Sequence, residues 1–256
     1  MTRGIGLIAN LINATRPSNN MDNIVVLLSG GMDSVTLLHY VRKTLDCRTV
    51  HALTFLYGQK HVRETECAAW QSDSLAVKEH HVLDLTGLGV FPDGASALTD
   101  KNRAVPDMAA LPPSQCDQPP TYVPNRNMIL LSLAVAYAEA RGIADVFYGA
   151  QAQDRYGYWD CAPEFLERMN AVLALNRRQA VRLHAPFIAM SKRDIIGIGR
   201  TLGVDYSRTW TCYRGGDKAC GACPSCVERL AAFRQNSIVD PVPYTDATPS
   251  QSSESS

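Results

Sequence analysis

The sequence predicts an α/β protein with a doubly wound, mostly parallel sheet that carries a small zinc-binding subdomain near its C-terminus. Short apolar runs alternate with amphipathic stretches of helical length, which is typical of a parallel sheet covered by helices on both faces. A glycine turn follows the first apolar run, and four cysteines crowd into residues 212–226. The 256 residues, 46% of them hydrophobic, suit one sizeable domain with a small appendage.

The first half of the chain predicts three strands and two helices. Apolar runs rich in β-forming residues indicate strands at residues 24–28, 50–57 and 81–85. The stretches between them have helical length and predict helices at about 33–43 and 61–75.

Residues 86–124 interrupt this alternation. They contain seven of the fourteen prolines, and proline removes backbone donors and restricts φ. Regular structure is therefore not expected, and we interpret the segment as an insertion or a mobile lid over a site.

The alternation resumes in the second half, with helices predicted at 127–141 and about 163–178 and strands at 145–149 and 181–187. Gly142 is expected to end the first of these helices, and Pro163 lies in the first turn of the second. Ser191 should cap a further short helix, with Asp194 in the capping-box position.

These elements suggest four parts. Residues 1–21 are expected to be a flexible N-terminal extension, and 22–205 the α/β domain. Residues 206–238 are expected to form the zinc-binding subdomain, and 239–256 a disordered tail, because its proline- and serine-rich sequence has little apolar area to bury.

The composition indicates which classes of binding partner to expect. Twenty-five basic residues balance twenty-five acidic ones, so the protein has no net charge that would attract nucleic acid or a membrane surface. Small-molecule partners are therefore expected. No apolar run approaches the roughly 20 residues of a membrane span, and no signal peptide is evident. Four of the eight cysteines are scattered (Cys47, Cys67, Cys116 and Cys161) and four are clustered, which favours metal binding over disulfides and predicts a cytoplasmic protein.

Residues 25–34 predict a phosphate-binding turn between a strand and a helix. Gly30 and Gly31 allow positive φ and let backbone N–H groups reach an anion, while the helix N-terminus adds roughly half a positive charge. The hydroxyls of Ser29 and Ser34 can donate to phosphate oxygens, and Asp33 can hold Mg²⁺. A strand–helix turn that merely needs glycine is the alternative reading.

The turn lacks both the Gly-Lys-Ser/Thr ending of the common nucleotide triphosphatase loop and the third glycine of a dinucleotide site, so those two classes are disfavoured. The run from Ser29 to Ser34 resembles the pyrophosphatase-loop family of ATP enzymes. That resemblance implies an adenine nucleotide alpha hydrolase-like, Rossmann-like fold. It also implies cleavage between the α- and β-phosphates, with transfer of AMP to a substrate oxygen.

Cys212, Cys220, Cys223 and Cys226 are spaced C-x7-C-x2-C-x2-C. Four thiolates satisfy tetrahedral Zn²⁺ and leave no open position for water, so the expected site is structural. An iron–sulfur cluster is the chief rival, and two disulfides are a weaker one.

The chain from about residue 24 to 233 resembles the 7-cyano-7-deazaguanine synthase family of queuosine precursor biosynthesis. The segments that carry this resemblance are residues 28–38, 57–61 with Glu64, 121–127, 158–161 and 211–226. It implies an ATP-dependent enzyme, a ligase forming carbon–nitrogen bonds, that turns 7-carboxy-7-deazaguanine and ammonia into the nitrile. The acid and then the amide would each be adenylated on oxygen. The family also suggests a homodimer.

The resemblance also implies site residues. The nucleotide would be held by Leu28, Ser29, Gly30, Gly31, Met32, Asp33, Ser34, Val35, Thr36, Leu37 and Leu38. The catalytic candidates are Asp33, Ser34, Arg126, Lys192 and His61. The substrate-binding candidates are Tyr57, Gln59, Glu64, Asn127, Asp154, Tyr158 and Asp160.

Several alternatives stay open. His61 has either a catalytic or a structural role, Lys192 and Arg126 have either catalytic or surface and capping roles, and Cys161 is either reactive or a small buried residue. Tyr156 and Trp159 depart from the family's pattern, so a paralogue acting on a different target is conceivable. The rival functions are a pyrophosphatase-loop enzyme that thiolates a tRNA base and a non-catalytic zinc module for nucleic acid.

Overall fold

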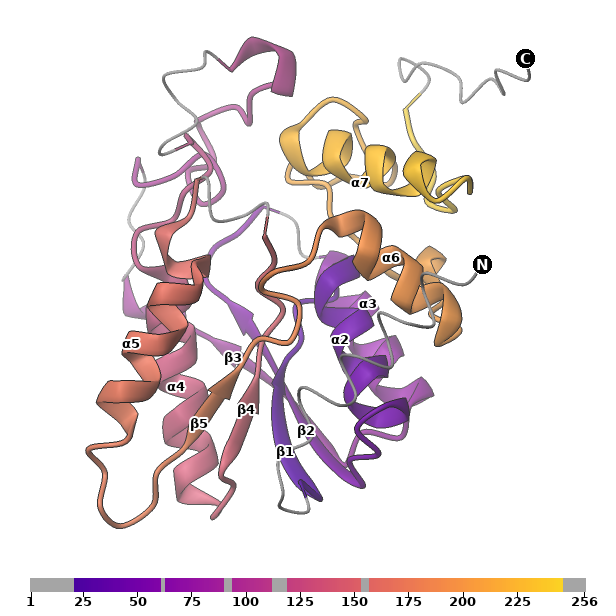
Figure 1. Ribbon diagram of the computed structural model, residues 1–256. Helices are drawn as coiled ribbons and strands as arrows, with labels where there is room; N and C mark the ends of the chain where they lie inside the picture. Colours follow the sequence, from indigo (N-terminus) through magenta and orange to yellow (C-terminus); the bar gives the residue numbers. More distant parts are fainter. Residues whose placement is uncertain (1–20, 61–62, 90–93, 112–118, 153–156, 246–256) are drawn as a thin grey trace.

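The computed structural model describes residues 21–60, 63–89, 94–111, 119–152 and 157–245. Its sheet has five parallel strands in the order β3-β2-β1-β4-β5 (Figure 1). The strands are β1 (Asn23–Leu27), β2 (Thr49–Leu56), β3 (Glu79–Asp84), β4 (Asp145–Phe147) and β5 (Arg182–His184). The strand order reverses between β1 and β4, and open α/β sheets bind ligands at the carboxyl edge of such a reversal.

Helices cover both faces of the sheet, so the predicted fold class is confirmed. Helices α2 (Met32–Lys43), α3 (Arg63–Ser74) and α6 (Lys192–Thr201) lie on one face, and α4 (Arg126–Ala140) and α5 (Pro163–Leu173) lie on the other (Figure 1). Helix α7 (Pro224–Gln235) packs beside α6, beyond the carboxyl edge of the strands. None of the described helices combines the length and apolar character that a bilayer crossing needs.

Side-chain alternation along the strands divides the interior into two cores. Val25 of β1 packs with the α4 residues Leu131 and Ala134, whereas its neighbours Ile24 and Val26 pack with α2 and α6. Successive strand residues point to opposite faces, so each buried strand contributes side chains to both cores. The sheet is thereby fixed between its helical layers, and its carboxyl edge holds the turns that follow each strand.

Three predicted elements extend less far than expected, and the first is strand β4, which stops at Phe147 rather than at residue 149. Helix α5 ends at Leu173 rather than near residue 178. Asn176 accepts hydrogen bonds from the backbone N–H groups of Arg178 and Gln179, which favours a turn over further helix. Strand β5 stops at His184 rather than at residue 187, because Pro186 lacks a backbone donor and the chain turns there. The predicted capping box of Ser191 and Asp194 is present at α6.

The proline-rich segment 86–124 contains, within its described residues, two 3₁₀ turns, Thr86–Leu88 and Met108–Ala110. It nevertheless contributes to the core, because Leu98 and Val123 are buried within the α4 layer. Its residues 90–93 and 112–118 lie outside the described part of the chain. Whether the segment moves as a lid stays a prediction.

The prediction of a disordered tail from residue 239 is wrong for its first seven residues. Asp240 and Val242 are buried, and Tyr244 forms a backbone bridge with Ala219. Composition alone is misleading here because the fold supplies a buried cation, Arg229, for the Asp240 carboxylate. Residues 246–256 and the predicted extension up to residue 20 lie outside the described residues.

Candidate active site

A cavity of about 230 Å³ opens at the carboxyl edge of the sheet, where the strand order reverses. Its walls come from the ends of β1, β2 and β4, the first turns of α2 and α4, and the segment that leads to the cysteine cluster. Polar lining residues from separate parts of the chain include Ser29, Asp33, Glu64, Arg126, Lys192 and Thr211. The position matches the ligand site expected of this topology.

The glycine turn at the end of β1 has the predicted positive φ at Gly30 but not at Gly31, whose φ is −75°. Gly30 has φ +89°, and a Cβ there would lie 1.9 Å from the carbonyl oxygen of Glu64. The hydroxyls of Ser29 and Ser34 are 3.0 Å apart, and Ser29 Oγ also accepts from the backbone N–H of Gly31 at 3.2 Å. Helix α2 begins directly afterwards, so its positive N-terminal end faces the cavity.

Gly30→Ala is expected to lose most activity and to destabilise the fold. A left-handed φ costs a non-glycine residue about 1–2 kcal/mol, and the overlap with Glu64 must be relieved by moving α3 or the turn. Gly142→Ala is the matched control, because Gly142 has φ +68° and nothing within 4 Å of its Cβ position. Denaturant titration and turnover should separate the two variants; equal losses of stability would contradict a steric role for Gly30.

Ten of the eleven predicted nucleotide-binding residues fall into two groups; the eleventh, Gly30, shapes the turn without lining the cavity. Leu28, Ser29, Gly31, Met32, Asp33 and Ser34 line the cavity. Val35, Leu37 and Leu38 are instead buried in the core against the sheet, and Thr36 bonds Met32 and the Tyr206 hydroxyl. The geometry therefore gives the second group a packing role that holds α2 in place.

Arg126 and Tyr57 both line the cavity. Arg126 is the first residue of α4, and its guanidinium carbon Cζ lies 5.8 Å from the ring centroid of Tyr158. Burial alone lowers the pKa of Arg126, but the surrounding polar side chains outweigh this and raise it above its usual value, so the guanidinium stays charged. Burial raises the pKa of Tyr57 and keeps its hydroxyl protonated. The pair presents a fixed cation and a neutral donor to a ligand.

Gln59 does not line the cavity, although Glu64 does. The Gln59 side chain accepts from the Tyr57 N–H at 2.8 Å and donates to Glu64 Oε1 at 3.2 Å. It therefore fixes the turn after β2 and orients Glu64, which is a supporting role rather than the direct contact that the sequence suggests.

Lys192 lines the cavity from the first turn of α6 and is paired with Glu228 of α7. Its side chain is 9% exposed and that of Glu228 is 32% exposed, so the ion pair lies at the cavity rim. The structure brings this predicted cation to the site and also ties α6 to α7 through it.

Asp160 is buried outside the cavity and caps helix α4. Its Oδ2 accepts from the backbone N–H of Asn127 at 2.9 Å, a favourable place for a carboxylate. Asn127, which lines the cavity, donates through its amide to Cys161 Sγ at 3.1 Å. Cys161 also lines the cavity and is 4% exposed.

Tyr158 lies beside this group but not in the cavity wall. Its hydroxyl and that of Thr121 are 2.8 Å apart, which joins the proline-rich segment to the turn after β4. His61, Asp154 and Tyr156 lie outside the described residues, so their predicted roles stay predictions.

Tyr148 is a cavity residue that sequence reasoning missed. It is 4% exposed, and its hydroxyl has no hydrogen-bond partner among the described residues. Burial raises its pKa, with Cys161 and Asp160 adding to the shift, so its hydroxyl stays protonated. Its position just after β4 was the signal available in the sequence.

The four predicted metal ligands come together. One ligand atom from each of Cys212, Cys220, Cys223 and Cys226 lies within 4.8 Å of all the others. Backbone N–H groups of Cys220 and Cys223 donate to the sulfurs of Cys212 and Cys220 at 3.4 and 3.3 Å. Hydrogen bonds from the Cys223 and Cys226 thiols lower the pKa of Cys212. An all-sulfur set of this closeness could hold one metal ion and leaves no ligand position open.

The cysteine cluster also shapes the cavity. Trp210, Thr211 and Tyr213 flank Cys212 in the chain and line the cavity, as does Ser225 beside Cys226. Ser225 Oγ donates to the Thr211 carbonyl at 2.8 Å. Among the predicted candidates only the cysteines of this region were named, so the wall itself was missed.

Comparison with known proteins places these features in a family. The model described as "Queuosine biosynthesis protein QueC" matches residues 23–237. A 7-cyano-7-deazaguanine synthase 1 from Colwellia psychrerythraea is 45% identical over 223 residues, which are 87% of this chain and 99% of the relative. A 7-cyano-7-deazaguanine synthase from Marinobacter nauticus is 47% identical over 223 residues, 87% of this chain and 97% of the relative.

A solved structure, the U34-tRNA thiolase NcsA from Methanococcus maripaludis with its [4Fe-4S] cluster, is similar in fold. The TM-score is 0.51 at 13% sequence identity, and the match covers 79% of this chain and 65% of that one. At this identity the likeness concerns the arrangement of strands and helices alone.

Proposed function

This chain belongs to the QueC family of queuosine biosynthesis proteins, and from that premise we propose that it is a 7-cyano-7-deazaguanine synthase. The name shared by relatives at 45% and 47% identity supports the product. The glycine turn at the N-terminus of α2, opening into a cavity with Asp33 and Arg126, supports ATP as the co-substrate. This turn is the observation that carries the proposal.

The proposed reaction joins 7-carboxy-7-deazaguanine and ammonia. A carboxylate is a poor electrophile because its oxygen is a poor leaving group. Transfer of AMP to that oxygen releases pyrophosphate and makes the oxygen leave as AMP when ammonia attacks the acyl carbon. The resulting amide is adenylated on its oxygen in turn, and loss of AMP with two N–H protons gives the C≡N bond. Both carboxylate oxygens thus depart in AMP.

The residues around the cavity fit this chemistry. The backbone N–H groups at the start of α2 and the hydroxyls of Ser29 and Ser34 can hold the outer phosphates. Arg126 can stabilise the charge that develops near the α-phosphate, because a preorganised cation acts strongly in a water-poor site. Glu64 and the Tyr57 hydroxyl can orient the purine-like substrate through hydrogen bonds.

Two metals belong to the proposal. Asp33, on the first turn of α2 and in the cavity wall, would hold Mg²⁺, which when bound neutralises the departing pyrophosphate. The four cysteines fit Zn²⁺, a metal that would stabilise the cavity wall and take no part in bond cleavage. Elemental analysis should find about one zinc per chain; iron with visible absorbance would favour a cluster instead.

Isotope labelling tests the reaction. Purified protein given ATP, ammonia and acid labelled with ¹⁸O in its carboxylate should produce the nitrile and about two AMP for each nitrile, with ¹⁸O in AMP. Mass spectrometry reads all three products. ADP in place of AMP, or AMP without label, would contradict the proposed adenylation.

The same assay addresses the tRNA thiolase alternative. A thiolase needs a reactive sulfur, and Cys161 is the cysteine of the described residues that lines the cavity away from the cluster. Because Cys161 is buried and bonded to Asn127, we expect Cys161→Ala to retain nitrile synthesis. Loss of AMP formation in that variant, together with sulfur transfer to tRNA by the unaltered protein, would favour the alternative. A cytoplasmic homodimer remains part of the proposal and can be checked by sedimentation.

A further inference from the structure

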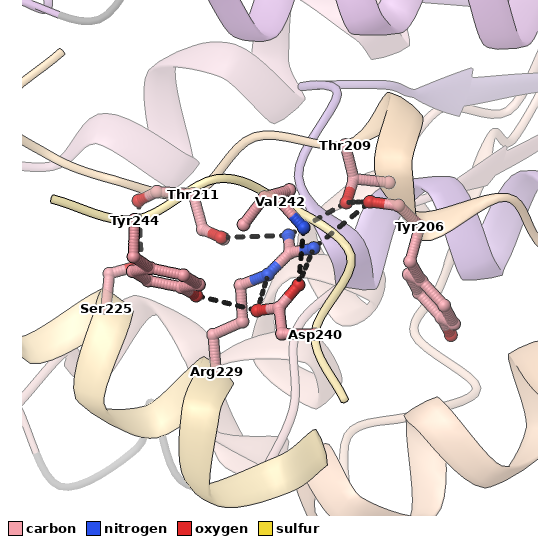
Figure 2. Close-up of polar contacts among 8 residues, drawn as sticks. All are labelled: Tyr206, Thr209, Thr211, Ser225, Arg229, Asp240, Val242 and Tyr244. Carbon is pink, nitrogen blue, oxygen red and sulfur yellow. Dashed lines mark hydrogen bonds and ion pairs between the residues drawn. The ribbon is translucent and has the colours of Figure 1, made fainter. Parts of the chain in front are cut away.

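Arg229 and Asp240 form a fully buried ion pair that the reaction outlined above does not use. Their side chains are 1% and 0% exposed, and Arg229 donates to both carboxylate oxygens at 2.7 and 2.9 Å (Figure 2). Removing two charges from water is costly, so a buried pair is weak evidence for stability alone. Its two short hydrogen bonds instead suggest that the pair holds two segments of the chain in one fixed arrangement.

The remaining N–H groups of Arg229 hold a single loop. Nη1 donates to Thr209 Oγ1 at 2.8 Å and to Thr211 Oγ1 at 3.1 Å, and Nη2 donates to the Tyr206 carbonyl at 3.1 Å (Figure 2). A guanidinium has five N–H donors in a rigid fork, and here all are used. The two threonines stand on either side of Trp210 in the chain, so the fork fixes the backbone on both sides of this residue.

Trp210 connects that loop to the phosphate turn. Its backbone N–H donates to the Gly30 carbonyl at 3.0 Å. Gly30 is the residue whose left-handed φ shapes the turn, and Trp210 and Thr211 themselves line the cavity. The path from Arg229 to the turn therefore consists of one threonine hydroxyl, the adjoining peptide and one backbone hydrogen bond.

Asp240 is held from the other side by the C-terminal segment 239–245. Its carboxylate accepts from the Tyr244 hydroxyl at 2.6 Å and from the Val242 N–H at 3.2 Å (Figure 2). Ala219, beside Cys220, donates its N–H to Pro243 at 2.8 Å and accepts from the Thr245 N–H at 2.9 Å. The segment thus closes over the cysteine loop and places the carboxylate that orients Arg229.

We propose that Arg229 and Asp240 are positioning residues that hold the loop around Trp210, and through it the phosphate turn, in the geometry that grips ATP. The inference rests on the proposed use of ATP at this turn. It assigns a role to residues 239–245, all of which lie beyond the part of the chain matched by the family model. Neither residue lines the cavity, so their effect on the nucleotide must pass through the loop that contains Trp210 and Thr211.

The test compares Arg229→Lys, which keeps the charge but loses the fork, with Arg234→Met on the exposed side of the same helix. Arg229→Lys should raise the KM for ATP about tenfold or more, leave the KM for ammonia unchanged and keep its bound metal. Arg234→Met should match the unaltered protein. A merely structural role would reduce the amount of folded protein without changing the KM of the folded fraction.

Thr211→Val provides a second variant that retains the ion pair and the shape of the side chain. It removes one acceptor of the fork and should raise the dissociation constant of a non-hydrolysable ATP analogue about threefold or more, measured by calorimetry on metal-loaded protein. If the unaltered protein binds the analogue and both Arg229→Lys and Thr211→Val bind it equally well, the positioning role is refuted. If the unaltered protein binds none, the proposed use of ATP fails instead.

Discussion

Asp33→Asn is expected to lower nitrile synthesis about 10³-fold while leaving the protein folded. The substitution keeps the shape of the side chain but removes the charge that would hold Mg²⁺ beside the phosphate turn. Neutralisation of departing pyrophosphate is worth several kcal/mol, and about 4 kcal/mol corresponds to about 10³-fold in rate. Steady-state production of AMP and nitrile at saturating Mg²⁺ measures the effect.

The fold should tolerate this change because Asp33 lies in the cavity wall rather than in either core. Its loss removes a carboxylate from the first turn of α2, which costs about 0.3–1 kcal/mol. Glu164→Gln is the matched control, since Glu164 is an acidic residue in the first turn of α5 and is exposed. An Asp33→Asn protein with more than a tenth of normal activity would contradict the assigned role.

Cys223→Ser is expected to release the metal and to destabilise the C-terminal part of the protein by about 4 kcal/mol or more. Cys223 is fully buried and precedes the first residue of α7, so loss of the metal frees both the helix start and the loop from Cys212. The cavity wall formed by Trp210, Thr211 and Tyr213 should loosen with it. Elemental analysis, thermal unfolding and hydrogen exchange over residues 206–245 would record these changes.

Cys67→Ser separates metal loss from the general effect of replacing a thiol. Cys67 is a partly exposed cysteine on α3 that does not belong to the cluster. The Cys67→Ser variant should keep the metal and nearly all of its stability. Chelator treatment should destabilise this variant as strongly as it destabilises the unaltered protein. Retention of a full metal content by Cys223→Ser would show that the cluster is not the metal site.

The glycine turn illustrates how much of the site could be predicted. A strand followed by two glycines, an aspartate and a serine specifies a backbone conformation within a few residues, and the structure has that conformation at Gly30. The cluster of four cysteines could be predicted equally well, because closely spaced sulfurs can converge on one ion whatever surrounds them.

Gln59 and Tyr148 illustrate what the sequence could not resolve. Both follow strands; the family resemblance implied Gln59 as a substrate contact, whereas the position of Tyr148 after β4 was a signal that was not used. The structure turns Gln59 toward the backbone and Glu64, and places Tyr148 in the cavity wall. The direction of a side chain after a strand depends on the packing of neighbouring elements, which local patterns do not encode.

The sequence by itself determined the α/β class, the glycine turn after the first strand and the cysteine cluster, since each depends on residues that are close together in the chain. Only the tertiary structure decided that the segment after residue 239 is ordered and that Arg229 joins it to the loop around Trp210. The Trp210–Gly30 hydrogen bond joins residues far apart in the chain. Such contacts arise when burial forces polar groups from distant segments to satisfy one another, and no local periodicity records which groups will meet.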